Sequence, residues 1–177
     1  MRSVHEDPIL RQALHSIYVA QFAAVKACAH AFSNGDATRM LTGLMGSRPW
    51  SWRVVGVTPA ALDAFAANGF KPPPRSLHRG HRHQRSQTAR ALFFDRADPM
   101  SLDEFFEFFL ARDETVIMTR AENAPRTNRA FPAYIPIDPN LGLFPCAAVV
   151  GWMHGDPEIE FLRALHETPA CHNPGES

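Results

Sequence analysis

The stretch Trp50–Gly69, WSWRVVGVTPAALDAFAANG, holds a strand-to-helix unit that decides how the rest of the chain is organised. Its first part, up to Val57, is rich in aromatic and β-branched residues, which favour a strand. Thr58 and Pro59 then supply an N-cap and a first-turn proline. The apolar residues that follow fit a helix that ends at Gly69. The stretch therefore predicts a β-strand followed directly by an α-helix.

Two helical segments are predicted before this unit. No glycine occurs from Asp7 to Phe32, and apolar residues recur there at helical spacing, so we expect a long helix capped by Asp7. The turn-forming sequence Ser33-Asn34-Gly35-Asp36 ends it, and a shorter helix follows up to Leu44.

Downstream, the patterns predict four further elements: a helix from the S-x-x-E capping box at Ser101 to Leu110, a buried strand over Thr115–Thr119, strand structure from Leu141 to Trp152, and a helix from Asp156 to Leu165. Residues 124–140 are expected to be irregular and the tail 169–177 frayed. We therefore expect a single α+β domain over residues 1–177. Its mixed or antiparallel sheet of three to five strands would be covered by the long N-terminal helix and shorter helices.

The composition fits one folded domain without an overall electrostatic field. The chain has 177 residues, 45% of them hydrophobic, so it can bury a core of its own. Its 18 basic residues balance its 18 acidic ones, so any site for a polyanion must be local. Arginine accounts for nearly all of the basic residues. This reflects either a compositional bias of the source or the use of guanidinium groups on phosphates.

The cysteines and the apolar runs bear on the cellular compartment. Cys28, Cys146 and Cys171 are odd in number and widely spaced, which indicates neither a disulfide framework nor a Cys-rich zinc site. No apolar run approaches the length of a membrane span, and the N-terminus lacks the pattern of a secretory signal. We expect a cytoplasmic protein that does not contact a membrane.

One segment departs from the charge balance. Within residues 75–96, six arginines stand against Asp95 alone, a balance of +5 (6 − 1), and three histidines accompany them. Residues 98–114 reverse this with six acids and one arginine, a balance of −5 (1 − 6). Two interpretations follow. Either the two stretches neutralise each other through exposed ion pairs between facing helices, or the basic stretch binds phosphate.

The phosphate interpretation gives roles to particular side chains. Cleavage of a phosphodiester needs a base that works near neutral pH, and His81 is the candidate. It also needs positive charge at the reacting phosphoryl group, for which Arg79 and Arg85 are the candidates. Gly80 would let the backbone approach a phosphate. Further nucleic-acid contacts are predicted for Arg75, Arg82 and Arg90.

A divalent metal ion, Mg²⁺ or Mn²⁺, would complete such a site. Glu122 and Asn123 come directly after a predicted buried strand, which would hold their side-chain oxygens in place as ligands. Glu122 is also a candidate for orienting the attacking water, and Asp113 is the third candidate ligand. The prediction requires the turn at Glu122 to come back to His81.

The same residues resemble a known family. A histidine at the end of an extended segment, an arginine four residues later, an acidic helix and a strand ending in T-x-x-E are similar to the arrangement in HNH-type, His-Me finger nucleases. Here these features are His81, Arg85, the helix 101–110 and the sequence Thr119–Glu122. The resemblance implies that His81 is the general base and that Glu122 or Asn123 contacts the divalent metal.

A second resemblance involves overlapping residues. The sequences Gly80-His81-Arg82 and Ala89-Arg90-Ala91-Leu92 are similar to the G-H-R-R…A-A box of ParB/sulfiredoxin-like domains. That family includes nucleotide-binding and nucleic-acid-binding proteins, nucleases and plasmid-borne factors. This resemblance therefore also implies a nucleic-acid ligand.

We therefore expect a small nuclease or nucleic-acid-binding protein that acts on the phosphodiester backbone, a metal-dependent DNase if it is an enzyme. The alternative is a non-catalytic inhibitor or adaptor, such as a plasmid- or phage-borne factor. It would dock on a protein partner through the Phe-rich helix 101–110 or through Trp50 and Trp52. The phenylalanines of that helix are expected to belong to the core or to a homodimer contact.

Overall fold

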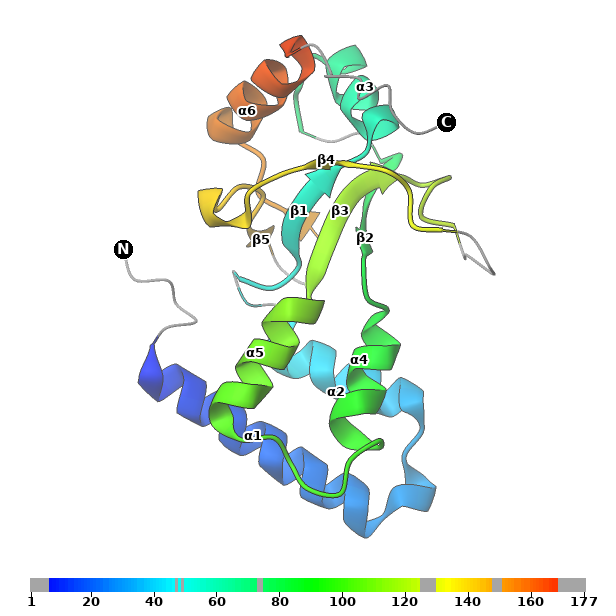
Figure 1. The fold of residues 1–177 in the computed structure, drawn as a ribbon, viewed down its shortest axis with the longest axis vertical. Helices are drawn as coiled ribbons and strands as arrows, with labels where there is room; N and C mark the ends of the chain where they lie inside the picture. The colour runs from blue at the N-terminus through cyan, green and yellow to red at the C-terminus, as the bar shows by residue number, and fades with distance from the viewer. Residues whose placement is uncertain are drawn as a thin grey trace, which may run out of the picture.

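The computed structural model describes residues 7–46, 48, 50–72, 75–124, 130–147 and 151–168, in which a helical half and a sheet half can be distinguished (Figure 1). The helical half contains α1 (Pro8–Ala27), α2 (Asn34–Met45), α4 (Arg85–Phe93) and α5 (Leu102–Arg112). The sheet half contains β1 (Arg53–Val57), α3 (Pro59–Ala67), β2 (Leu77–His81), β3 (Glu114–Thr119), β4 (Ile135–Pro136) and α6 (Asp156–Glu167). Shorter elements are the 3₁₀ turns η2 (Ala29–Ala31) and η3 (Pro139–Leu141) and the two-residue strands β5 (Cys146–Ala147) and β6 (Gly151–Trp152).

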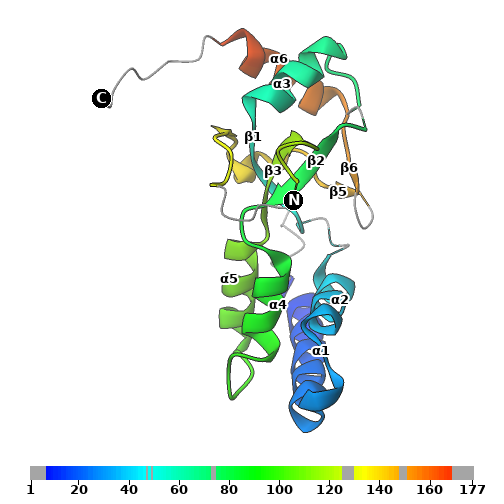
Figure 2. The ribbon, with the colours of Figure 1, turned by 90° about the vertical axis from the view of Figure 1, so that its right-hand side faces the viewer.

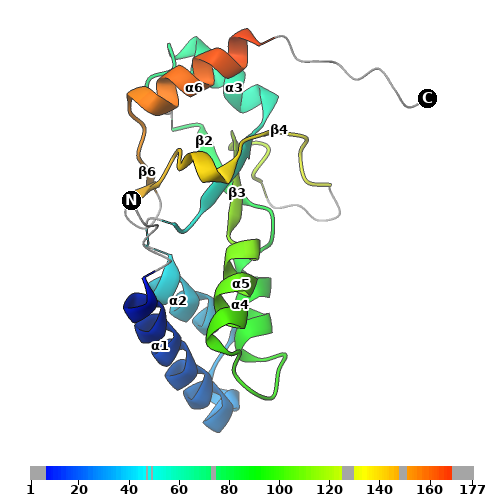
Figure 3. The same cartoon turned by 60° about the vertical axis from the view of Figure 1, so that its left-hand side comes forward.

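The main sheet is mixed, with the strand order β2-β3-β1-β4. β1 and β3 are parallel, and the edge strands β2 and β4 run antiparallel to their neighbours. α3 and α6 lie together over the sheet half (Figure 3). A shared core joins them to one face of the sheet, and its fully buried side chains include Val57, Phe65, Ile117 and Leu162. The predicted α+β class with a small mixed sheet is confirmed.

The four helices of the helical half form a core of their own. α1 and α2 lie beside α4 and α5 in two layers (Figure 2), and the main contacts of α1 are with these helices and not with the sheet. Tyr18 is central to this core. Its ring stacks on Phe105 at 4.4 Å, and its hydroxyl donates to the carbonyl of Leu92 and accepts from the backbone N–H of Met100. These contacts tie α1 to both α4 and α5.

The capping sequences position several helices as predicted. Asp7 accepts hydrogen bonds at the start of α1, Thr58 does the same for α3, and Ser101 with Glu104 forms a capping box on α5. The segment at Ser33 differs from its prediction. It does not end the first helix, which stops before it, but begins α2, because Ser33 and Asp36 form a second capping box.

Three predicted boundaries are wrong. The first helix ends at Ala27 and a 3₁₀ turn replaces its last residues. β1 begins at Arg53 and not at Trp50, because Trp52 has a φ of 60°, which interrupts an extended chain. Over the stretch from Leu141 to Trp152, Leu141 ends the turn η3, and the strands formed by the described residues are the short β5 and β6. The predicted frayed tail 169–177 lies outside the described residues.

The Phe-rich helix faces inward. Phe105, Phe106 and Phe109 are buried in the core of the helical half, and Phe108 lies under the guanidinium of Arg112 at 4.4 Å. A partner or a second copy would therefore meet the carboxylates of this helix and not its phenylalanines. Within the described residues, no helix has the length and apolar character needed to cross a membrane.

Candidate functional site

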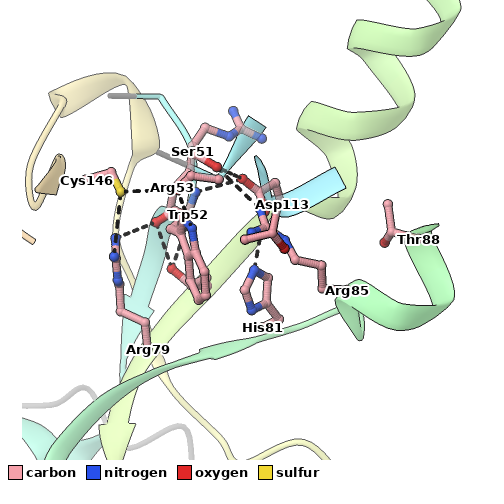
Figure 4. A network of polar contacts seen from close by, with 12 residues as sticks. Ser51, Trp52, Arg53, Arg79, His81, Arg85, Thr88, Asp113 and Cys146 are labelled. Carbon is pink, nitrogen blue, oxygen red and sulfur yellow. Dashed lines mark hydrogen bonds and ion pairs between the residues drawn. The ribbon is translucent and has the colours of Figure 1, made fainter. Parts of the chain in front are cut away.

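The chain connections between the helical half and the sheet half meet at the carboxylate of Asp113 (Figure 4). Ser51 and Trp52 lie on the chain between α2 and β1, His81 and Arg85 lie where β2 leads into α4, and Asp113 lies between α5 and β3. Each connection links an element of the helical core to an element of the sheet core. The connections therefore cross the boundary between the two cores at the same place, and their side chains meet there. This junction is the candidate functional site.

The Asp113 carboxylate accepts hydrogen bonds from both of the other connections. Its Oδ2 accepts from the hydroxyl of Ser51 and from the backbone N–H of Trp52, both at 2.7 Å. Its Oδ1 lies 2.7 Å from Nη2 of Arg85 and 3.3 Å from Nε2 of His81. Because a carboxylate only accepts, the contact with His81 requires the proton on Nε2. One side chain thus holds three chain connections together.

The pKa of Asp113 reflects this environment. Burial by itself raises the pKa of a carboxyl group, but the hydrogen bond from His81 and the positive charge of Arg85 outweigh burial and lower the pKa of Asp113 to about 2. Asp113 is therefore ionised at neutral pH although its side chain is only 2% exposed. It also lies at the C-terminal end of α5, where a negative charge is unfavourable unless a cation accompanies it.

Arg85 supplies that cation. Its guanidinium lies 4.7 Å from the centroid of the Trp52 ring. Its Nη1 lies so close to Gly46 that a Cβ there would be 2.8 Å away. Gly46 ends α2, so Arg85 brings positive charge to the C-terminal ends of both α2 and α5. Among the described residues Nη1 itself has no hydrogen-bond partner.

His81 is held between an aromatic ring and a carboxylate. Its ring centroid lies 4.3 Å from that of Trp52, whose indole N–H donates to the carbonyl of Gly46. An Asp–His pair is the arrangement that orients an imidazole as a base. Here, however, Ser51 donates its hydroxyl to Asp113 and not to His81. The crevice at this site is narrow and is also lined by Leu41, Thr88, Phe109 and Arg112.

Arg79, predicted as a phosphate clamp, is buried on the same side of β2 as His81. Its Nη2 donates to the carbonyl of Gly151 at 2.7 Å, and its guanidinium lies 5.1 Å from the Trp52 ring and 5.5 Å from the Trp152 ring. Burial lowers the pKa of Arg79. The side chain thus joins the hairpin β5–β6 to the main sheet, and it is not presented to a ligand in solution.

Glu122 does not come back to His81. His81 is paired with Thr115 near the start of β3, and the Glu122 carboxylate is bound at Thr119, so four residues of the strand, about 13 Å, separate them. Glu122 instead accepts hydrogen bonds from Thr58 and Thr119. Its carboxylate joins the ends of β1 and β3.

Asn123 lies on the other face of the sheet from His81. A Cβ on Gly80 would be 2.8 Å from Oδ1 of Asn123, and neighbouring residues of a strand point to opposite faces. The three predicted metal ligands, Glu122, Asn123 and Asp113, are therefore not gathered. Within the part of the chain that the structure describes, no group of three or more His, Cys, Asp or Glu side chains is placed to hold a metal ion.

The arginines predicted to contact nucleic acid are all on the surface. Arg82 has its side chain 41% exposed and lies 2.6 Å from Glu114. Arg90 on α4 pairs at 3.0 Å with Asp95, just after the end of that helix. Arg75 is exposed before β2. The basic and acidic stretches do form ion pairs with each other, as one interpretation predicted. The pairs lie at the junction, however, and the pair with Asp113 is buried.

Trp50 and Trp52 do not form the predicted surface patch. Trp50 is buried in the core of the helical half, and Trp52 is half-buried against His81, Arg79 and Arg85. The two side chains serve different parts of the molecule because the chain turns at Trp52.

Sequence patterns did not reveal a second feature, an open groove on the other face of the sheet. Its volume is about 480 Å³, and it is lined by Arg82, His83, Phe131, Pro132, Ala133 and Tyr134. Residues 131–134 lie in the stretch predicted to be irregular. No local pattern relates them to Arg82, because the contact joins segments far apart in the sequence.

Comparisons of the chain with protein-family models, with curated proteins and with solved structures give no match. The resemblances to His-Me finger nucleases and to ParB/sulfiredoxin-like domains therefore stay predictions. The function has to be inferred from the residues of the chain itself.

Proposed function

We propose that this chain is a nucleic-acid-binding protein and that the groove at the end of β2 is its contact surface. The observation that supports this proposal is the position of Arg82, an exposed arginine that lines an open groove together with His83. Positive side chains at such a groove bind the phosphates of a nucleic-acid backbone and release its counterions. A chain with no net charge needs a local site of this kind.

The proposal concerns binding and not strand cleavage. The predicted base His81 lies on the face of the sheet opposite the groove, and the predicted water-orienting residue Glu122 is at the other end of β3. Arg79 and Arg85 are committed to contacts inside the protein. Of the arginines near the end of β2, Arg82 is the one that lines the groove.

Salt-dependent binding tests the proposal. A fluorescein-labelled oligonucleotide is titrated with the protein, and its anisotropy is followed at several salt concentrations. We expect the logarithm of the association constant to fall linearly with the logarithm of the salt concentration. Arg82→Gln should weaken binding and reduce the magnitude of that slope by about 1.

Arg39→Gln is the matched control. Arg39 is also an exposed arginine in a surface ion pair, with Asp36 at 3.0 Å, but it lies on α2 in the helical half. This variant should bind as the unchanged protein does. Absence of binding at low salt, or equal losses in both variants, would reject the proposal. Nicking of plasmid DNA in the presence of Mg²⁺ or Mn²⁺, lost on His81→Ala, would instead support the nuclease prediction.

A further inference from the structure

The groove has an aromatic wall. Phe131 and Tyr134 pack edge to face, with ring centroids 6.1 Å apart and planes at 88°. They cover a small apolar cluster on the sheet, formed by Val55, Val116 and Met118. Both rings are only half-buried, so part of their surface faces the groove. This wall lies on the face of the sheet opposite His81 and Arg79.

Gly56 fixes the position of the Tyr134 ring. A Cβ at residue 56 would lie 2.1 Å from Cδ2 of Tyr134 and 2.8 Å from its Cε2. The ring edge therefore rests directly on the backbone of β1, in space that any other residue would fill. An aromatic ring held in this way loses little conformational freedom when a ligand stacks on it.

A cation lies beside the same ring. The guanidinium carbon of Arg82 is 5.9 Å from the centroid of the Tyr134 ring, and His83 is exposed next to it. Glu114 accepts from Arg82 but also lies 3.6 Å from Arg53, so arginines outnumber the carboxylate here. The groove thus combines an aromatic surface with positive charge at its rim.

This combination distinguishes one form of nucleic acid from another. In a duplex the bases are stacked and paired, and side chains in a groove meet phosphates and base edges. In a single strand the faces of the bases are available, and proteins bind them by stacking on aromatic rings while basic side chains follow the backbone. The volume of the groove is also within the range of about 300–1,000 Å³ that is typical of sites for small ligands.

We infer that the groove binds single-stranded nucleic acid, with one base stacked against Tyr134 and a neighbouring phosphate at Arg82. This inference rests on the proposed function and adds the class of ligand to it. The aromatic ring supplies affinity that does not depend on charge, and Arg82 supplies the affinity that depends on salt.

Three labelled probes of the same length, about twelve residues, test this inference on the full chain. They are oligothymidylate, a strand of abasic residues with the same phosphates, and a duplex. We expect oligothymidylate to bind at least about fivefold more tightly than the abasic strand, because the stacking of one base provides that much affinity. The duplex should bind less tightly than oligothymidylate.

Two variants of Tyr134 then locate the stacked base. Tyr134→Leu keeps an apolar side chain but removes the ring, and it should remove most of the difference between oligothymidylate and the abasic strand. Tyr134→Phe keeps the ring and should retain that difference. Thermal unfolding checks that both variants are folded. If Tyr134→Leu does not fold, the inference is tested by the affinities of the unchanged protein for oligothymidylate and for the abasic strand.

The outcomes separate the two proposals. Equal affinity for oligothymidylate and the abasic strand, or tighter binding of the duplex, would overturn the inference and leave the proposed function standing. A stacking difference that survives in Tyr134→Leu would also overturn it. Failure of all three probes to bind at low salt would reject the proposed function itself.

Discussion

Nη2 of Arg85 lies 2.7 Å from Oδ1 of Asp113, and the two side chains are only 9% and 2% exposed. This buried ion pair joins the chain between β2 and α4 to the chain between α5 and β3. The remaining acceptor positions of Asp113 are occupied by Ser51, Trp52 and His81, so the carboxylate is fully hydrogen-bonded. The junction of the two halves therefore contains two buried charges, and each would be strongly destabilising without the other.

Replacement of Asp113 should destabilise the protein strongly. Asp113→Asn removes the negative charge and leaves Arg85 buried without its counter-ion, which should lower the free energy of unfolding by about 3 kcal/mol or more. Urea denaturation followed by circular dichroism measures this loss. Asp103→Asn, in the first turn of α5, is the control. Asp103 pairs with Arg11 but is 80% exposed, so its loss should be below about 1 kcal/mol. Similar losses in both variants would contradict the prediction.

Asp113 should also make stability depend on acid pH. Its pKa is about 2 in the folded protein against an ordinary value of 3.8, so as the pH falls the unfolded chain binds this proton first. Asp113 therefore contributes about 2 kcal/mol of stability above about pH 4, and this contribution disappears as the pH falls to about 2. The measurement is the difference in unfolding free energy between the unchanged protein and Asp113→Asn across this range. Other carboxyl groups titrate alike in both proteins, so a difference that stays constant would count against the prediction.

Two glycines should respond in opposite ways to the same substitution. Gly56→Ala places a Cβ 2.1 Å from the Tyr134 ring, so the ring must move, which should cost about 1–3 kcal/mol. Gly43→Ala lies within α2 with no atom within 4 Å of the new Cβ, and it should stabilise the protein by about 0.5–1 kcal/mol. Thermal unfolding of both variants measures the effects. If Tyr134 is the cause, Gly56→Ala should cost much less in a Tyr134→Ala background.

Much of the fold could be predicted because the signals are local. The N-cap residues Asp7, Thr58 and Ser101 begin helices where expected, and the apolar run 115–119 is the buried strand β3. These signals act within one or two turns of the chain. The start of β1 could not be predicted in this way. Trp52 adopts a positive φ that its residue type does not favour, and its contacts with distant residues hold it there.

The candidate site was predicted only in part. His81 and Arg85 do lie together, as their spacing suggested, and Asp113 joins them. Glu122 and Asn123 do not, because the strand that was expected to present them to His81 instead separates Glu122 from it, and Asn123 lies on the other face of the sheet. The groove residues Phe131 and Tyr134 had no signal in the sequence.

The sequence by itself determined the α+β class, most helix starts and the presence of a basic segment next to an acidic one, because caps, periodicity and charge are properties of neighbouring residues. Only the tertiary structure decided what each cation does. Strand β2 points Arg79 and His81 to one face, where Arg79 is buried and His81 meets Asp113. Arg82, which follows the strand, lies on the other face beside Tyr134. Segments distant in the chain decide which face of the sheet is covered by the core and which carries the groove. No local sequence pattern contains this information.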